Sequence, residues 1–184
     1  MELGAEDLDR GLEKVRSSPT RKGTLELIVR RPRVDEREVL SEGFLDLEEG
    51  LVGDSWSTRG SSMTIDGNAD PAAQLNIMNA RAAALIAGPV EQWALAGDQL
   101  FVDLDLSGAS MPAGTRLGIG ETVIEITAKP HRGCVKFSAR FGLEALRLVN
   151  SPTGVALNLR GRNARVITPG SIRVGDAVTR LSPS

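Results

Sequence analysis

The chain has 184 residues, a formal net charge of −2 and 41% hydrophobic residues, which is enough for one domain with a proper core. The slightly acidic balance gives no bulk attraction to nucleic acid or anionic lipid. Aromatic residues make up only 3% and Tyr is absent, so surfaces that stack on single-stranded bases are poorly supplied. We therefore expect no nucleic-acid partner and no membrane partner.

The first third of the chain predicts a helix, a further helical stretch and two irregular regions. Apolar residues at helical spacing predict a short amphipathic helix over residues 5–15, within an N-terminal extension of residues 1–22. Residues 35–47 have a mixed pattern that we interpret as a helix leading into a glycine-punctuated turn over 50–54. Residues 57–73 are rich in Ser, Gly, Asn and Asp and predict an exposed loop.

The clearest strand of this region is predicted over residues 22–30, before the proline at position 32. Simple alternation places Leu25, Leu27 and Val29 on one face. It places Ile28 on the other face.

The remainder predicts short strands separated by turns, with helices between them. Asn79 is expected to cap a helix that runs through Ala87. A second helix is predicted over 141–149, and strands are predicted over 74–78, 99–106, 116–119, 121–128, 164–168 and twice within 171–180. This order favours a mainly β single domain of residues 1–184, an antiparallel barrel with helical insertions.

The inventory of side chains removes several reaction classes. A structural zinc site needs four Cys or His ligands, and the chain has one of each. No Ser lies in a G-x-S-x-G elbow, and no phosphate-binding loop or dinucleotide fingerprint is present. We therefore expect no nucleotide cofactor.

Residues 129–137 hold both the only cysteine and the only histidine. Cys134 follows His131 by three positions, with Arg132 and Lys136 beside it. Cationic neighbours favour the thiolate, the form that attacks sulfur or binds a soft metal. We take Cys134 and His131 as candidate catalytic residues and Cys134 as the candidate metal ligand, in a loop or at the start of a strand.

The opposite interpretation of this segment stays open from the residues alone. Free cysteines are among the most buried residues, and a lone histidine is usually a hydrogen-bonded bystander. In an extended chain the Cα atoms of His131 and Cys134 lie about 10 Å apart, so cooperation needs a turn between them. Gly133 would leave room beside the sulfur for a bulky ligand.

A second candidate site is the tract of residues 158–165. Arg160, Arg162 and Arg165 stand beside Asn163, and guanidinium groups bind phosphate as a bidentate fork. A solvated hairpin explains the same pattern equally well.

Three aspartates, Asp54, Asp98 and Asp176, each follow a glycine. Asp in such turns usually accepts hydrogen bonds from backbone N–H groups, so we assign these residues no catalytic role.

Five short motifs occur in order along roughly residues 45–180. They are Gly-Leu-Val-Gly-Asp at 50–54, Ala-Gly-Asp-Gln-Leu at 96–100, Gly-Thr-Arg-Leu-Gly-Ile-Gly at 114–120, Val-Ile-Glu-Ile-Thr at 123–127 leading to Cys134, and Pro-Gly-Ser-Ile-Arg-Val-Gly-Asp at 169–176. Together they resemble the MOSC domain, found at the C-terminus of molybdenum cofactor sulfurases and in related free-standing proteins.

The resemblance implies a Greek-key β-barrel in which Cys134 carries sulfur or ligates molybdenum. It also implies that the molybdenum cofactor (molybdopterin) is bound through its pterin phosphate by basic and amide side chains. Our candidates for that contact are Arg132, Lys136, Arg160, Arg162, Asn163 and Arg165. The implied partners are a cysteine desulfurase or other sulfur donor and a molybdoenzyme or redox partner.

The sequence departs from the family pattern at several positions. Many relatives have His where Trp56 stands, and many have Pro directly before the cysteine, where this chain has Gly133. The pyridoxal phosphate-dependent desulfurase domain of the fused enzymes is also absent from this sequence, so another protein would have to supply sulfur to Cys134.

Three functions follow as hypotheses, and they leave open whether the protein is an enzyme. The first is a cofactor-binding or sulfur-carrying module with Cys134 as persulfide site or molybdenum ligand. The second is a molybdenum-dependent reductase of N-hydroxylated compounds, and the third is a non-catalytic ligand-binding barrel with an inert, buried Cys134. A single cysteine and an acidic N-terminus, unlike a signal peptide, favour the cytoplasm.

Overall fold

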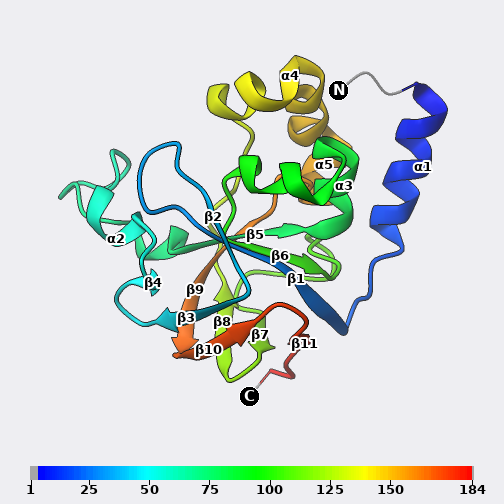
Figure 1. Cartoon of the computed structure of the whole chain (residues 1–184). Coiled ribbons are helices and arrows are strands. Elements are labelled where there is room, and N and C mark those ends of the chain that lie inside the picture. The colour runs from blue at the N-terminus through cyan, green and yellow to red at the C-terminus, as the bar shows by residue number, and fades with distance from the viewer. Residues whose placement is uncertain (1–3, 184) are drawn as a thin grey trace.

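A computed structural model describes residues 4–183 and shows a mainly β protein with a few short helices (Figure 1). Seven strands form a closed barrel, because β11 pairs back onto β1. Around the barrel the order is β1 (Lys22–Arg30), β11 (Ala177–Arg180), β7 (Arg116–Ile119), β8 (Thr122–Ile126), β9 (Arg162–Thr168), β5 (Leu75–Asn79) and β6 (Leu100–Asp103). The predicted barrel is confirmed. Residues 1–3 of the expected N-terminal extension, and residue 184, lie outside the described residues.

Every neighbouring pair in the barrel is antiparallel except β5 and β6. A parallel pair needs a long crossover connection. Here it consists of α3 (Ala80–Ala87) and η2 (Val90–Ala96). The Asn79 side chain accepts hydrogen bonds from the backbone N–H groups of Arg81 and Ala82, so the predicted cap is confirmed.

The other elements surround this barrel. Strand β2 (Glu38–Leu40) pairs with the end of β1, and β10 (Gly170–Arg173), β3 (Glu42–Asp46) and β4 (Gly50–Leu51) form a second sheet. The remaining helices are α1 (Ala5–Arg16), α2 (Trp56–Arg59), η1 (Pro71–Ala73), α4 (Val135–Asn150) and α5 (Pro152–Ala156). In Figure 1, α3, α4 and α5 gather at one end of the barrel. Within residues 4–183 no helix has the length and apolar character needed to cross a bilayer.

Two hydrophobic cores share the central strands, one inside the barrel and one under the helices. The pairing of β1 with β6 shifts register between Leu25 and Leu27, which marks a β-bulge. Because the extra residue reverses the alternation, Leu25 and Ile28 pack inside the barrel, whereas Leu27 and Val29 pack under the helices. The expectation that Leu25 shares a face with Leu27 and Val29 is therefore wrong.

The helix predicted over 35–47 is also wrong. Residues 38–40 pair with the end of β1, and residues 42–46 pair with β10. The partner strand β10 lies far away in the sequence, so local patterning could not reveal it.

Helix α4 begins at Val135, six residues before the predicted start at Phe141. Gly142 has non-helical angles, with φ of 88°, so α4 consists of two helical pieces that meet at a kink. Cys134 is therefore the N-cap residue of α4, at the end of a loop. Of the two places expected for it, the loop is confirmed and the start of a strand is wrong.

The connection into β9 depends on a glycine and generates a testable prediction. Gly161 has φ of 107°, and a β-carbon there would lie 2.3 Å from the carbonyl oxygen of Ile77. We expect Gly161→Ala to lower the free energy of unfolding by about 2–4 kcal/mol, because backbone strain and a steric clash add.

Urea unfolding measures this loss, with Gly114→Ala as the matched control. Gly114 has φ of 89°, but a β-carbon at that position would meet no atom within 4 Å. Gly114→Ala should therefore lower the free energy of unfolding only through backbone strain, by about 1 kcal/mol. Equal losses in the two variants would show that the approach of Gly161 to β5 is unimportant.

Candidate functional site

A cavity of about 360 Å³ opens beside Cys134. It lies where the end of β1, the 96–97 turn and the first turns of α4 meet. Its lining contains seven cationic side chains and one acidic side chain, that of Asp35. The cationic residues are Arg31, Arg33, Arg37, Arg59, Lys136, Arg140 and Arg160. Positive charge is thus concentrated at one place in a chain whose net charge is −2.

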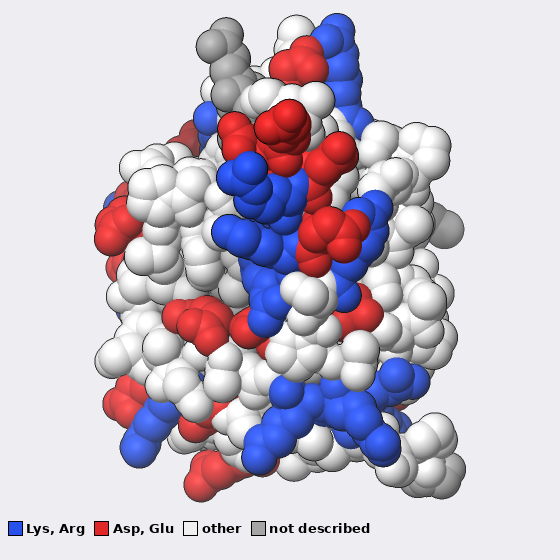
Figure 2. Space-filling view, turned by 90° about the vertical axis from the view of Figure 1, so that its right-hand side faces the viewer, with Lys and Arg blue, Asp and Glu red and all other residues white. Residues whose placement is uncertain are grey.

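The face that carries α1 has a different charge pattern. Figure 2 shows Lys and Arg interspersed with Asp and Glu on that face. Arg10 forms an ion pair with Asp7, and Arg81 forms one with Asp103. Local neutralisation there contrasts with the excess of cations at the cavity.

Cys134 is exposed at the rim of the cavity. Its position is fixed by Gly133, whose N–H donates to Asn150 Oδ1 and whose carbonyl accepts from Asn150 Nδ2, both at 3.1 Å. A β-carbon on Gly133 would lie 2.7 Å from Val149 Cγ2, so this glycine lets the segment pack on α4 rather than leaving room at the sulfur. The exposed thiol contradicts the buried cysteine of the inert-barrel hypothesis.

A buried ion pair forms the floor of the cavity. The side chain of Asp54 is fully buried and accepts two hydrogen bonds from the Arg31 guanidinium, at 2.9 Å and 2.8 Å. Arg31 also donates to Asn76 Oδ1 and to the carbonyl of Gly97. Burial raises the pKa of Asp54, but hydrogen bonding and the charge of Arg31 outweigh it, so the pKa lies below its usual value.

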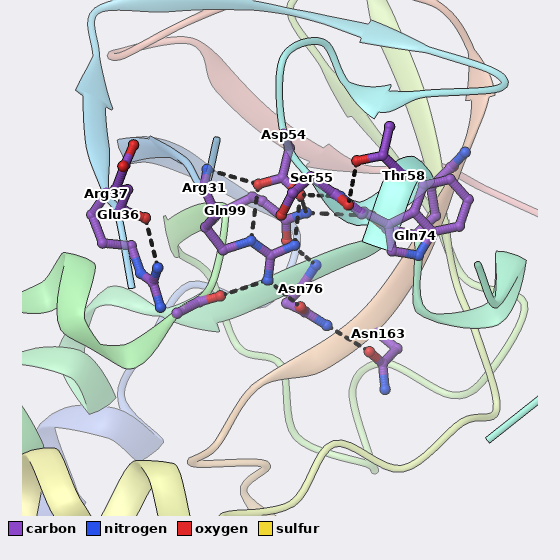
Figure 3. A network of polar contacts seen from close by, with 12 residues as sticks. Arg31, Glu36, Arg37, Asp54, Ser55, Thr58, Gln74, Asn76, Gln99 and Asn163 are labelled. Atoms are coloured by element: carbon purple, nitrogen blue, oxygen red, sulfur yellow. Dashed lines mark hydrogen bonds and ion pairs between the residues drawn. The ribbon is translucent and has the colours of Figure 1, made fainter. Parts of the chain in front are cut away.

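Amide side chains extend this network to the cysteine segment. Asn76 Nδ2 donates to Asn163 Oδ1 at 2.7 Å, as Figure 3 shows. Asn163 Nδ2 then donates to the carbonyls of Lys129 and Pro130. A continuous chain of hydrogen bonds therefore joins Arg31 to the backbone that leads to His131.

A second buried ion pair holds His131. The fully buried carboxylate of Asp98 accepts from Arg160 Nη1 at 2.5 Å and lies 3.2 Å from His131 Nε2. Burial opposes the charge on Asp98, but Arg160 and His131 outweigh it, so the pKa of Asp98 is lowered. Burial and the charge of Arg160 likewise lower the pKa of His131, against the opposing effect of Asp98.

Several cationic groups at the cavity lack full compensation. Arg37 Nε and Arg160 Nε are buried without a hydrogen-bond partner in residues 4–183. Burial, then repulsion from Arg140 and Arg31, lowers the pKa of Arg37. A β-carbon at Gly97 would lie 3.6 Å from both Arg37 Nη2 and Arg140 Nη1, so these two guanidinium groups converge over that glycine. Such a cluster is stabilised by an anion.

The structure brings four of the predicted site residues to the cavity. Cys134, His131, Lys136 and Arg160 all line it. Arg132 is exposed and is not part of the lining.

The other predicted cofactor contacts lie elsewhere. Arg162 donates to the carbonyl of Met111, and Arg165 forms an ion pair with Glu125 on β8. Asn163 is buried and supports the backbone rather than facing a ligand. Because residues on β9 point alternately to opposite sides, the arginine tract does not converge on one ligand.

Sequence reasoning missed the cations that come from the end of β1. Arg31, Arg33 and Arg37 fall within eight residues, and this density was the available signal. The sequence-based interpretation also treated Asp54 and Asp98 as residues that cap turns. Asp54 does accept from the N–H of Trp56, but Asp98 binds only side chains within the described residues.

Protein side chains alone offer few metal ligands here. Among residues 4–183, no group of three or more His, Cys, Asp and Glu is placed to hold a metal ion. Cys134 could therefore contribute a single ligand to a metal whose other ligands come from a cofactor.

The buried pair beneath the cavity generates a prediction. We expect Asp54→Ala to lower the free energy of unfolding by about 3–5 kcal/mol at pH 7, because it leaves the Arg31 charge buried and unpaired. The control is Glu42→Ala, which breaks an exposed pair with Arg173 and should cost less than about 1 kcal/mol.

The same measurement at lower pH tests the assignment. A lowered carboxyl pKa stabilises the folded state above the ordinary pKa and loses that effect as the pH falls through the lowered value. The stabilities of wild type and Asp54→Ala should therefore converge in acid. A constant difference from neutral to acidic pH would contradict an ionised Asp54 in the folded protein.

Comparison with known proteins gives a family match for part of the chain. Residues 100–179 match the family model of the MOSC domain. No protein with a curated description matches the sequence significantly.

Solved structures share the fold at low sequence identity. The YuaD protein from Bacillus subtilis matches with a TM-score of 0.62 and 16% identity over 89% of this chain and 97% of that chain. A structure titled as a hypothetical protein matches with a TM-score of 0.60 and 21% identity, over 92% of this chain and 71% of that chain. YiiM from Escherichia coli matches with a TM-score of 0.57 and 21% identity, over 88% of this chain and 71% of that chain. Residues 100–179 therefore match the MOSC domain model, and the barrel as a whole shares its fold with YuaD and YiiM.

Proposed function

We propose that the cationic cavity binds the molybdenum cofactor and that Cys134 serves there as sulfur carrier or molybdenum ligand. The MOSC domain family is associated with molybdenum cofactor binding. The observation that carries the proposal is an exposed thiol at the rim of a cavity lined by seven cationic side chains.

The residues present fit the two ends of such a cofactor. A phosphate dianion suits the converging guanidinium groups of Arg37 and Arg140, because Arg37 Nε has no hydrogen-bond partner among residues 4–183. A thiolate suits a soft, sulfur-rich metal centre. When bound, the cofactor would supply a molybdenum centre able to take a sulfur ligand. The protein would supply Cys134 and the cations that hold the phosphate.

As a sulfur carrier, Cys134 would take part in a thiol exchange. Its Sγ would attack the outer sulfur of a donor persulfide, a new S–S bond would form, and the donor cysteine would leave as a thiolate. A cysteine desulfurase is the expected donor, and a molybdoenzyme or redox partner the expected recipient. Because the thiol is exposed, this role requires a reducing compartment such as the cytoplasm.

A molybdenum-dependent reductase of N-hydroxylated compounds is the second candidate. It uses the same cavity, which is open to solvent beside Cys134 and could admit a small substrate. Turnover of such a compound by cofactor-loaded protein, lost in Cys134→Ser, would favour it over the carrier role.

Persulfide formation tests the carrier role directly. We expect wild-type protein incubated with a cysteine desulfurase and cysteine to gain the mass of one sulfur atom at Cys134, because its thiol is accessible. Intact-mass spectrometry without reducing agent measures this gain. The Cys134→Ser variant, which should gain no mass on incubation, provides the background. A wild-type protein that likewise gains no mass would exclude the carrier role.

Cofactor retention tests the cationic cavity. We expect Arg37→Gln to weaken retention of molybdenum by about tenfold, because it removes a charged donor whose Nε has no partner in the described part of the chain. Molybdenum is measured in protein purified from a host that makes the cofactor. Arg165→Gln is the matched control, since Arg165 pairs with Glu125 away from the cavity. Equal retention in the two variants would contradict binding at this cavity.

A further inference from the structure

The cavity is rich in hydrogen-bond donors and poor in free acceptors. Arginine and lysine side chains can only donate. Several nearby acceptors already receive hydrogen bonds from arginines. Arg31 donates to Asn76 Oδ1 and the Gly97 carbonyl, Arg160 to the Ala96 carbonyl, and Arg140 to the Leu95 carbonyl and to Oδ1 of the exposed Asp35. A ligand that carries its own O–H or N–H group would therefore find few places to donate it.

His131 provides such a place. Its side chain lines the cavity and is 17% exposed, with Nε2 directed to Asp98. Nδ1 makes no hydrogen bond within residues 4–183, yet it is not among the buried atoms without a partner. Nδ1 is therefore not sealed from solvent, and the His131 side chain borders the cavity.

The Asp98 carboxylate determines which ring nitrogen carries the proton. An ionised carboxylate can only accept, so Nε2 must be protonated to bond with Asp98 Oδ1, and Nδ1 then keeps its lone pair. Arg160 holds the other oxygen of the same carboxylate, so the carboxylate cannot turn away from the ring without losing that ion pair.

The surroundings of His131 also keep the ring neutral at physiological pH. The imidazole contacts Asp98, whose side chain is fully buried behind the cavity wall. The charged groups that line the cavity itself are Asp35, Arg31, Arg33, Arg37, Arg59, Lys136, Arg140 and Arg160. Burial, followed by the charges of Arg160 and Arg31, lowers the pKa of His131 against the opposing effect of Asp98. Neutral imidazole therefore persists to more acidic pH than in an isolated histidine.

We propose that His131 Nδ1 is a specificity-determining hydrogen-bond acceptor, positioned by Asp98 and Arg160. It makes the cavity select oxyanions that carry a protonated oxygen over oxyanions of similar shape that carry none. The inference rests on the cationic cavity of the proposed function and names the class of ligand it prefers. It does not depend on molybdenum.

The lone histidine makes the first experiment direct. Because the chain contains one histidine, the imidazole ¹⁵N signals of labelled wild-type protein report on His131 alone. At pH 7 we expect the neutral Nε2–H tautomer. An Nδ1–H tautomer, or an imidazolium ion at that pH, would overturn the inference without the need for any variant.

The second experiment compares two probes of similar shape. Inorganic phosphate at neutral pH carries at least one O–H group, whereas sulfate carries none. We expect wild-type protein to bind phosphate about tenfold more tightly than sulfate in calorimetric titrations, the difference that one hydrogen bond makes. In His131→Phe the two affinities should come within about twofold of each other, with sulfate binding kept.

A third variant reverses the polarity of the acceptor. In Asp98→Asn, Arg160 still requires an acceptor, so the amide should place its oxygen toward Arg160 and its NH₂ toward His131 Nε2. The proton then moves to Nδ1, and the phosphate preference should disappear. Asp103→Asn, at an ion pair with Arg81, is the matched control and should keep it. If Asp98→Asn does not fold, the tautomer seen in the wild-type ¹⁵N spectrum and the anion titrations of His131→Phe still test the acceptor role of His131.

The outcomes separate this inference from the proposed function. Equal binding of phosphate and sulfate by wild type would overturn the acceptor role while leaving the cationic cavity in place. Binding of neither anion would overturn both. Molybdenum retention that depends on Arg37, together with equal anion binding, would support the proposed function alone.

Discussion

The buried ion pair between Arg31 and Asp54 is the interaction on which the rest of the site depends. Two charges removed from water are stable only when their geometry is good and their remaining donors and acceptors are satisfied. Here Arg31 donates to Asp54, Asn76 and the Gly97 carbonyl, so one side chain joins the end of β1 to the turn after β4, to β5 and to the turn before β6. A single guanidinium thus fixes four segments beneath the cavity relative to one another.

This arrangement explains how a slightly acidic protein maintains a strongly basic cavity. The two most buried arginines, Arg31 and Arg160, are each matched by a buried carboxylate behind the cavity wall. Their charge is balanced within the fold. The more peripheral cations, such as Arg37, Arg59 and Lys136, have no acidic partner among the ion pairs of the described residues, so they supply the net attraction for an anion. Structural and ligand-binding arginines therefore coexist at one site with different partners.

The sequence supported the barrel and the cysteine better than the surrounding contacts. Alternating strands such as 100–103 and the Asn79 cap follow from local patterns, and the ordered motifs pointed to the family whose model matches residues 100–179. The bulge in β1 and the strands at 38–46 depend on partners distant in sequence, which local patterns do not encode. At the site, Cys134, His131, Lys136 and Arg160 were found because they share rare or basic segments. Arg37 was missed because its meeting with Arg140 is made by the tertiary fold.

The closure of the barrel by β1 and β11 has a consequence for the order of assembly. Gly23 pairs with Val178, so the ring closes through two segments from opposite ends of the described chain. Bringing such distant segments together costs loop-closure entropy before any contact repays it, which makes this pairing slow to form. The strand that makes this late contact, β1, also leads directly into Arg31 and the cationic wall of the cavity. One strand therefore serves both features, since β1 closes the barrel against β11 at its start and pairs with β2 at its end, next to Arg31.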